Sequence, residues 1–278
     1  MPLVDADQLG APLRRLFAPL DDHLLTASIL AGLTPAQVFV GEPQAPTWVL
    51  AWFQHRLLLS GDTRQAAQAG RLLQDEVLPR LRHAGLSGVV LYPGEPGWLE
   101  HLAELLPGLR CFPEQCEYYT CTRLQQDWRP LLPPGFQVIP VDAALFSAGL
   151  GGLDELRQEM CSERPSPQDF LDRSFGVCLV HAGQVAGWCL SEYNCDRRCE
   201  VGVGVTAGLR RRGLGTVLSL ALVEMALERG MTQIGWHCWA ENTASGALAR
   251  RAGFTLASRY PAVYCELEAV AECEVRSG

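Results

Sequence analysis

Three consecutive arginines stand directly before a glycine-rich turn in the C-terminal half of the chain. The run is Arg210, Arg211, Arg212, Gly213, Leu214, Gly215 and Thr216, and its last residue begins the long apolar stretch TVLSLALVEMALER. The first N–H groups of a helix lack backbone partners and the helix dipole makes that end electropositive, so both features favour phosphate. Glycines allow the N–H groups to approach an anion closely. The run therefore predicts a pyrophosphate site at a helix N-terminus.

The segment before this turn, VGVGV at residues 201–205, consists only of valine and glycine. Alternating small residues suit a strand whose edge holds an extended ligand, so Val203, Gly204 and Val205 are expected to carry the rest of a long cofactor. The alternative is a buried strand that precedes a capped helix and binds nothing. That alternative leaves the spacing of the arginines and glycines unexplained.

A second motif lies downstream of the first. The expected strand IGWHCW is followed by Glu241, Asn242, Ser245 and Leu248 in the order E-N-x-x-S-x-x-L, and then by Ala252, Gly253 and Phe254. Together the two motifs resemble the acetyl-CoA signatures of the GNAT N-acetyltransferase superfamily, over about residues 136 to 268. The form CWAENTAS is similar to a bacterial subgroup whose N-terminal half is a degenerate GNAT-like unit.

The resemblance implies acetyl-CoA as the co-substrate and a role for each matching position. It implies that the backbone of Val203–Val205 hydrogen-bonds the pantetheine arm and that Arg211–Thr216 supply N–H groups to the pyrophosphate. Asn242 and Ser245 would lie beside the cofactor, where two strands diverge. These positions, together with Arg210, form the predicted cofactor-binding set.

Acetyl transfer to an amine requires a neutral nucleophile, and a nearby carboxylate can accept its proton directly or through water. Glu200 begins the valine–glycine strand, and Glu192 lies on the strand before it. Both are predicted catalytic residues, and the alternative for each is a solvated residue of the polar hairpin YNCDRRCE. His237 is more typical of a packed strand residue than of a base.

The second motif departs from the family pattern where a proton donor is expected. Many family members carry a tyrosine after the leucine of this motif, as the general acid for the departing CoA thiolate, and Ala249 stands at that position here. Tyr264 is the predicted replacement, with Tyr260 or water as alternatives. Water suffices chemically because a thiol with a pKa of about 8.5 is a fairly good leaving group.

The order of expected elements is the same in the two halves. Apolar periodicity predicts strand, strand, helix, strand, short helix and strand in each. In the N-terminal half these include strands over AQVFVGE, TWVLAWFQHRLLLSG and SGVVLYPG and a helix from Thr63 to Gly85 with a kink at Pro79. In the C-terminal half a third strand, CEVGVGV, precedes a helix that Gly230 ends.

This repeated order predicts an α/β fold, with an α+β mixed sheet, made of tandem GNAT-like units. Only the C-terminal unit carries the glycine-rich turn, so the intact acetyl-CoA site is expected there. The proline-rich stretch RPLLPPGFQVIP is the expected seam. It separates a degenerate N-terminal domain over residues 1–130 from a catalytic domain over residues 131–278.

Composition narrows the partners and the compartment. With 31 acidic and 23 basic residues the formal charge is −8, which argues against a nucleic-acid backbone as a partner. No apolar run is long enough to span a bilayer, and the start lacks a basic segment followed by an apolar block. We therefore expect no membrane association and a cytoplasmic protein.

Eleven cysteines are then expected to be reduced thiols. Neither the spacing of Cys111, Cys116 and Cys121 nor that of Cys195 and Cys199 matches a CxxC zinc site, so no metal is predicted. An oxidised Cys195–Cys199 pair at a hairpin tip is the alternative to two free thiols there.

These observations predict an N-acetyltransferase that moves an acetyl group from acetyl-CoA to an amine by direct attack. The acceptor would be a small-molecule amine or a protein amino group, and its determinants would lie on loops and on the N-terminal half. The absence of a tyrosine at Ala249 motivates an alternative of another class, a non-catalytic acyl-CoA-binding sensor or interaction module.

Overall fold

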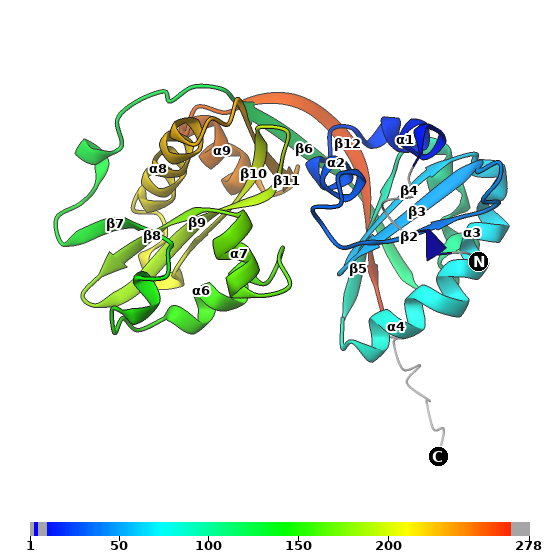
Figure 1. Cartoon of the computed structure of the whole chain (residues 1–278), viewed down its shortest axis with the longest axis horizontal. Coiled ribbons are helices and arrows are strands. Elements are labelled where there is room, and N and C mark those ends of the chain that lie inside the picture. Colours follow the sequence, from blue (N-terminus) through cyan, green and yellow to red (C-terminus); the bar gives the residue numbers. More distant parts are fainter. Residues whose placement is uncertain (1–2, 5–9, 268–278) are drawn as a thin grey trace, which may run out of the picture. The chain divides into compact units, whose positions relative to one another are not determined.

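A computed structural model describes residues 3–4 and 10–267 of the chain, which divides into two units (Figure 1). One unit comprises Met1–Gln115 and Pro261–Gly278, and the other comprises Cys116–Tyr260. Each unit is a mixed sheet flanked by helices, so the predicted α/β class is confirmed. Within the described ranges, no helix is both long enough and apolar enough to cross a membrane.

The first unit has its strands in the order β1-β2-β3-β4-β5-β12. Strands β2, β3 and β4 are antiparallel neighbours, and β5 is parallel to β4. Its elements in chain order are β1 (Leu3–Val4), α1 (Ala11–Phe17), α2 (Leu24–Leu30), β2 (Gln37–Val40), β3 (Trp48–Phe53), β4 (Arg56–Gly61), α3 (Ala66–Leu72), α4 (Leu78–His83), β5 (Gly88–Pro93), α5 (Leu102–Leu105) and the start of β6 (Arg110–Cys121).

The second unit repeats this topology, with the strand order β6-β11-β10-β9-β8-β7. Strands β8, β9 and β10 are antiparallel neighbours, and β11 is parallel to β10. Its elements are the end of β6, β7 (Phe136–Pro140), α6 (Leu153–Met160), α7 (Pro167–Arg173), β8 (Gly176–His181), β9 (Gln184–Cys195), β10 (Arg198–Val205), α8 (Leu214–Glu228), β11 (Gln233–Trp239), α9 (Thr243–Arg251) and the start of β12 (Thr255–Glu266).

The units differ from the predicted ranges 1–130 and 131–278 because β6 and β12 each contribute to both. Residues Cys116–Cys121 of β6 pair antiparallel with β11, so they complete the sheet of the second unit. Residues Val263–Glu266 of β12 pair antiparallel with β5, so they complete the sheet of the first. Strand pairing therefore sets the division of the chain, and the prolines after β6 do not.

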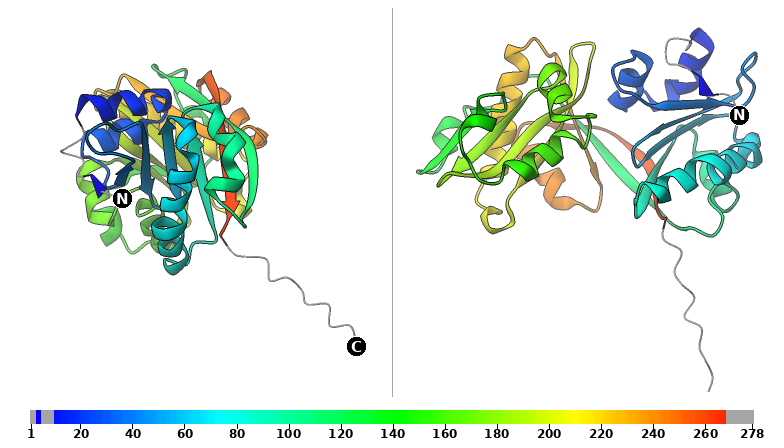
Figure 2. Two further views of the ribbon diagram at one scale, coloured as in Figure 1. Left: turned by 90° about the vertical axis from the view of Figure 1, so that its right-hand side faces the viewer. Right: turned by 60° about the horizontal axis from the view of Figure 1, so that its bottom comes forward.

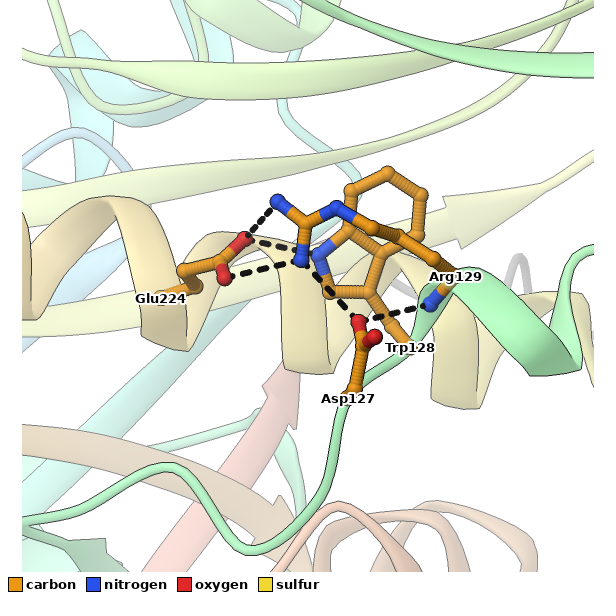
Figure 3. A network of polar contacts seen from close by, with 4 residues as sticks. All are labelled: Asp127, Trp128, Arg129 and Glu224. Atoms are coloured by element: carbon orange, nitrogen blue, oxygen red, sulfur yellow. Dashed lines mark hydrogen bonds and ion pairs between the residues drawn. The ribbon is translucent and has the colours of Figure 1, made fainter.

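The proline-rich stretch after β6 is fixed to α8 inside the second unit (Figure 3). Arg129 donates through Nη1 and Nη2 to the two carboxylate oxygens of Glu224, each at 3.0 Å. Trp128 Nε1 donates to the same carboxylate at 2.9 Å, and the Arg129 guanidinium lies 4.7 Å from the Trp128 ring centroid. The hydrogen bonds from Arg129 and Trp128 hold the pKa of Glu224 below its usual range. The stretch is thus an ordered connection.

Two expected elements of the N-terminal half are interrupted in the structure. The segment TWVLAWFQHRLLLSG forms two strands, because the chain turns at Gln54, with φ of 50°, and Phe53 faces Arg56. The expected helix from Thr63 to Gly85 breaks into α3, a π-helical turn over Leu73–Val77, and α4. Proline lacks an N–H group, which explains a wider turn just before Pro79.

In the second unit, α8 and α9 cover one face of the sheet, and α6 and α7 cover the other (Figure 2). Helix α8 buries Leu214, Leu218 and Leu222 against the sheet. On the opposite face Leu156 and Met160 of α6 pack with Leu190 of β9. Below, these are called the α8 face and the α6 face.

Candidate functional site

Strands β10 and β11 diverge soon after they begin to pair. Their parallel register covers Arg198–Glu200 and Gln233–Gly235, although β10 continues to Val205 and β11 to Trp239. The other edge of β10 stays paired with β9 as far as Val205 and Gly187. Backbone N–H and C=O groups need partners when they are buried, so the β11-side edge of residues 201–205 is available to an extended ligand.

A cavity of about 540 Å³ opens at this edge. It is lined by Val203, Gly204, Val205, Leu209, Arg210, Arg211, Gly213, Leu214, Gly215, Thr216, Asn242, Ala244, Ser245, Leu248 and Arg251. The structure thus brings together all of the predicted cofactor-binding residues except Arg212. Ala244 and Arg251 lie on α9, which the sequence motif did not single out at those positions.

The N-terminus of α8 faces this cavity without a side-chain cap. Gly213 is the N-cap residue, with φ of 77°, and no acidic residue lies in the first turn. A Cβ at Gly213 would meet no atom within 4 Å, so the backbone there borders open space. The first N–H groups of the helix are therefore available to an anion, and the dipole favours one.

The three arginines before this helix point to different places. Arg210 Nε donates to the carbonyl oxygen of Val205 at 3.0 Å and ties the turn to the end of β10. Arg211 has φ of 61° and lines the cavity. Arg212 does not line the cavity, because its guanidinium lies 5.4 Å from the Phe136 ring centroid. The left-handed backbone at Arg211 explains why consecutive side chains separate.

The start of α9 closes the cavity on its other side. Asn242 Oδ1 accepts from the Ser245 N–H at 3.1 Å and caps the helix, while Trp236 Nε1 donates to Ser245 Oγ at 3.0 Å. A Cβ at Gly215 would lie 3.0 Å from Leu248, so α8 and α9 approach closely there. Asn242 and Ser245 therefore organise the cavity wall through hydrogen bonds within the protein.

A buried carboxylate, Glu117 of β6, connects this strand to α9 and to β12. Arg250 Nη1 donates to the Tyr119 hydroxyl at 2.7 Å, and that hydroxyl donates to Glu117 at 2.5 Å. Arg259 Nη2 donates to the same carboxylate at 2.7 Å. Burial and Glu117 raise the pKa of Tyr119 to about 12, while Tyr119 and Arg259 lower the pKa of Glu117.

On the α6 face, three side chains form a continuous hydrogen-bonded chain. Glu200 Oε1 lies 3.0 Å from His237 Nε2, and His237 Nδ1 lies 2.6 Å from the Tyr260 hydroxyl. The imidazole stacks on Tyr118, with ring centroids 4.4 Å apart. Glu200 and His237 belong to β10 and β11, so their contact bridges the two diverging strands. A carboxylate, an imidazole and a phenol in series can hold or pass a proton.

The two predicted carboxylates lie on this same face. Glu192 of β9 is directly opposite Glu200 in the strand register. A Cβ at Gly202 would overlap the Glu192 carboxylate, so that carboxylate lies over β10 where a glycine leaves room. The structure therefore brings Glu192 and Glu200 together.

Tyr264 lies in the first unit. Tyr264 pairs with Val90 of β5, and its ring stacks with Phe112 at 6.3 Å. Its hydroxyl end lies where a Cβ on Gly88 would be. The structure accordingly does not place Tyr264 among the residues of the cavity or of the Glu200 chain.

His237 and Tyr260 are the site residues that lay outside the predicted catalytic set. Strand alternation could have identified His237, because Trp236 and His237 of one strand must face opposite sides. Trp236 is buried in the core of the α8 face, which leaves His237 on the α6 face with Glu200. Ala249, at the position of the usual family tyrosine, is fully buried in that same core.

Comparison with known proteins identifies the family of the chain. The family described as GNAT acetyltransferase matches residues 14–263 of the chain. The chain belongs to the GNAT acetyltransferase family. A Bacillus subtilis (strain 168) protein, the uncharacterized N-acetyltransferase YdfB, is 26% identical over 133 residues, which are 48% of this chain and 49% of that protein. The matched part therefore spans about half the length of this relative.

Solved structures of GNAT proteins share the fold along nearly the whole chain. A GCN5-related N-acetyltransferase-like protein from Streptococcus suis 89/1591 has a TM-score of 0.70 and 23% identity, over 95% of this chain and 100% of that one. A tandem GNAT protein from the clavulanic acid biosynthesis pathway has a TM-score of 0.56 and 14% identity, over 96% and 98%. The predicted GNAT resemblance and the tandem fold are confirmed.

Proposed function

We propose that this protein transfers an acetyl group from acetyl-CoA to an amine. The observation that carries the proposal is the uncapped N-terminus of α8, which opens on a cavity continuous with the β11-side edge of β10. The helix start suits the pyrophosphate of coenzyme A, and the strand edge suits its extended, amide-containing pantetheine arm. Membership in an acetyltransferase family supports the same donor.

In this proposal the pyrophosphate of acetyl-CoA binds the first N–H groups of α8. Arg211 and Arg251, which both line the cavity, add positive charge beside it. The pantetheine amides pair with the backbone of residues 201–205 as a further strand would, because this edge diverges from β11. The thioester then lies between β10 and β11, near the bridge from Glu200 to His237.

The reaction requires one bond exchange and one proton exchange. The amine nitrogen forms a bond to the acetyl carbon, the carbon–sulfur bond breaks, and the electron pair leaves with the CoA sulfur. The nitrogen loses one proton, and the sulfur gains one. Backbone N–H groups of β10 stabilise the negative oxygen of the intermediate.

The chain of Glu200, His237 and Tyr260 is proposed to manage the protons. With the Nε2–H donated to Glu200, the Nδ1 atom of His237 accepts from the Tyr260 hydroxyl. His237 can therefore take the proton of Tyr260 and return it to a phenolate formed there. Tyr260 is the proposed group that exchanges protons with the substrates. His237 and Glu200 act through it, as positioning residues.

The proposal is tested by titrating acetyl-CoA into Gly213→Glu in a calorimeter. The new carboxylate would enter the cavity at the phosphate position, so we expect affinity to fall by at least 100-fold. Gly230→Glu is the matched control, because Gly230 follows the C-terminal end of the same helix with φ of 81° and open space around its Cβ position. Equal affinity in the two folded variants would contradict the proposed donor site.

The buried alanine at position 249 keeps the non-catalytic sensor as a second candidate function. A sensor would bind acetyl-CoA and release no thiol with any acceptor. Thiol release over a panel of primary amines therefore separates the two functions. We expect release above the rate of the protein-free reaction for at least one amine.

A further inference from the structure

Strands β12 and β6 are antiparallel neighbours in the first unit. Strand β12 lies between β5 and β6 in the sheet. Arg110 Nη1 lies 3.2 Å from Glu266 Oε2, and the Phe112 ring stacks on Tyr264, with ring centroids 6.3 Å apart. Along β6 the residue number rises from 110 to 112 while along β12 it falls from 266 to 264, which is the register of an antiparallel pair. The residues midway between these two contacts therefore face each other.

The facing residues are two cysteines, Cys111 and Cys265. Facing Cα atoms of antiparallel strands are about 4.5–5.5 Å apart, and disulfides span about 4.4–6.8 Å between Cα atoms. Both side chains contact the core of the first unit, and the Cys265 thiol donates a hydrogen bond to the Cys111 sulfur. The two sulfur atoms are therefore close enough to form a disulfide with little movement of the backbone.

The two thiols differ in exposure and in reactivity. Cys111 is partly exposed, whereas Cys265 is fully buried. The hydrogen bond from Cys265 lowers the pKa of Cys111, while the same hydrogen bond and burial raise the pKa of Cys265. Since the thiolate is the nucleophile, an oxidant from solvent reacts first at Cys111, and Cys265 is the adjacent thiol that resolves the product.

We propose that hydrogen peroxide converts Cys111 and Cys265 into a reversible disulfide that stabilises the first unit. The Cys111 thiolate attacks one oxygen of the peroxide, the O–O bond breaks, and the other oxygen leaves as hydroxide, which takes up the proton that Cys111 lost. The Cys265 sulfur then attacks the sulfenic acid, so that the S–S bond forms, the S–O bond breaks, and the Cys265 proton leaves with that oxygen as water. The thiol pair loses two electrons, and one peroxide is reduced to two waters.

The disulfide joins β12 to its neighbour inside the first sheet. It closes a loop from residue 111 to residue 265, which contains all of Cys116–Tyr260. A cross-link reduces the freedom of the unfolded chain, and this effect grows with the length of the loop. Oxidation therefore stabilises the first unit against the separation of β12 from β6, and a thiol reductant reverses the change.

The first test maps the cross-link. The folded full chain is treated with hydrogen peroxide, its remaining thiols are blocked with iodoacetamide, and it is digested with trypsin. Cys111 lies in the tryptic peptide 111–123, and Cys265 lies in the tryptic peptide 260–276. We expect these two peptides to be linked and to separate in dithiothreitol. Fragmentation of the linked pair should place the bond between Cys111 and Cys265.

Cys161→Ser is the matched control for Cys111→Ser, because Cys161 is likewise partly exposed but belongs to the second unit. The yield of linked peptides should fall at least 20-fold in Cys111→Ser and less than 2-fold in Cys161→Ser. Equal yields in these two variants would overturn the proposal. So would peroxide treatment of the wild-type chain that leaves Cys111 as a sulfinic acid without a link.

Urea unfolding gives a second readout. The midpoint of the peroxide-treated chain should lie at least about 1 M above that of the chain reduced with dithiothreitol. This difference should vanish in Cys111→Ser and in Cys111→Ala, which keeps an apolar side chain toward the core. A midpoint that oxidation leaves unchanged in the wild-type chain would contradict the proposal. None of these measurements involves acetyl-CoA, so their outcome is independent of the proposed function.

Discussion

The two units share one topology, but the parallel strands at the centre of each sheet separate earlier in the second unit than in the first. In the second unit β10 leaves β11 after Glu200, five residues before its end. In the first unit the corresponding strand β4 stays paired with β5 through Leu59, two residues before its end at Gly61. The space that a cofactor arm would need is therefore absent between β4 and β5 at that level.

In the first unit, carboxylates occupy both the end of β4 and the start of the helical segment that leads to α3. Glu95 accepts from the Gly61 N–H at 2.8 Å and from Trp98 Nε1 at 3.1 Å. The turn that leads to α3 is capped by Asp62, which accepts from the Arg64 N–H at 3.1 Å. Gly213 stands at the equivalent helix start in the second unit.

This difference shows that the fold supplies only the possibility of a site. The helix start and the strand edge exist in both units. Side chains of the first unit satisfy them internally and place negative charge where a phosphate would bind, whereas glycines of the second leave them open. Three predictions test how far this contrast extends.

The largest effect is expected from His237→Ala, which tests whether the open unit also performs the chemistry. Loss of the imidazole breaks the chain between Glu200 and Tyr260, so kcat should fall about 100- to 1,000-fold. Acetyl-CoA affinity should change less than 3-fold, because His237 does not line the donor cavity. Tyr118→Phe, which keeps the stacked ring, is the control and should retain most of the activity. Equal loss in both variants would indicate a packing role for His237.

A smaller effect is expected from Glu95→Gln in the closed unit. The carboxylate accepts hydrogen bonds from the Gly61 N–H and the Trp98 indole, and its loss should lower the stability of the first unit by about 2 kcal/mol. Chemical denaturation, followed by hydrogen exchange in β3 and β4, measures this change. Acetyl-CoA affinity should be unaffected. Glu100→Gln, at an exposed position in the same region, is the control. A variant as stable as the wild type would show that Glu95 does not stabilise the end of β4.

The smallest predicted effect is a loss of folding stability in mild acid that is specific to the first unit. Burial, with a further contribution from Arg56, lowers the pKa of His55 to about 4, from an ordinary value of about 6.5. Between these values the unfolded chain binds a proton that the folded chain does not, so stability is complete above pH 6.5 and decreases as the pH falls toward 4. The loss should be about 2 kcal/mol, allowing for partial solvent exposure.

The second unit should resist this pH range. Its buried Glu117 has a lowered pKa. The stability that the Glu117 carboxylate contributes to the folded unit is therefore lost only below the ordinary pKa of a glutamate. Hydrogen exchange at pH 7 and pH 5 compares the units, and His55→Gln should remove the difference in β3 and β4. Equal sensitivity of the two units would contradict this assignment.

The sequence was most informative where backbone conformation is dictated by residue type. Gly213 and Gly215 leave the start of α8 without a side-chain cap, so the lining of the cavity there could be predicted almost residue by residue. Arg212 was the exception. The left-handed conformation of Arg211 directs the side chain of Arg212 toward Phe136. Side-chain direction in such a turn does not follow from spacing.

The contact between Glu200, His237 and Tyr260 was harder to predict because it depends on pairing between distant segments. Glu200 meets His237 only through the short parallel register of β10 and β11, and Tyr260 joins them from a third segment. The same limitation applies to the boundary at residue 130. Proline content marks a connection, but it does not report that Cys116–Cys121 pair with a strand more than 100 residues later.

The exchange of β6 and β12 has a consequence for biosynthesis. The first sheet receives Val263–Glu266, which are synthesised only after the whole of Cys116–Tyr260. Domains usually fold as they are made, from the N-terminus onward, but this one cannot finish until the second unit has been translated. Until β12 is made, the nascent first unit exposes the edge of β5. We therefore expect the folding yield of this chain to depend more on a chaperone that shields strand edges than that of a GNAT protein with two independent units.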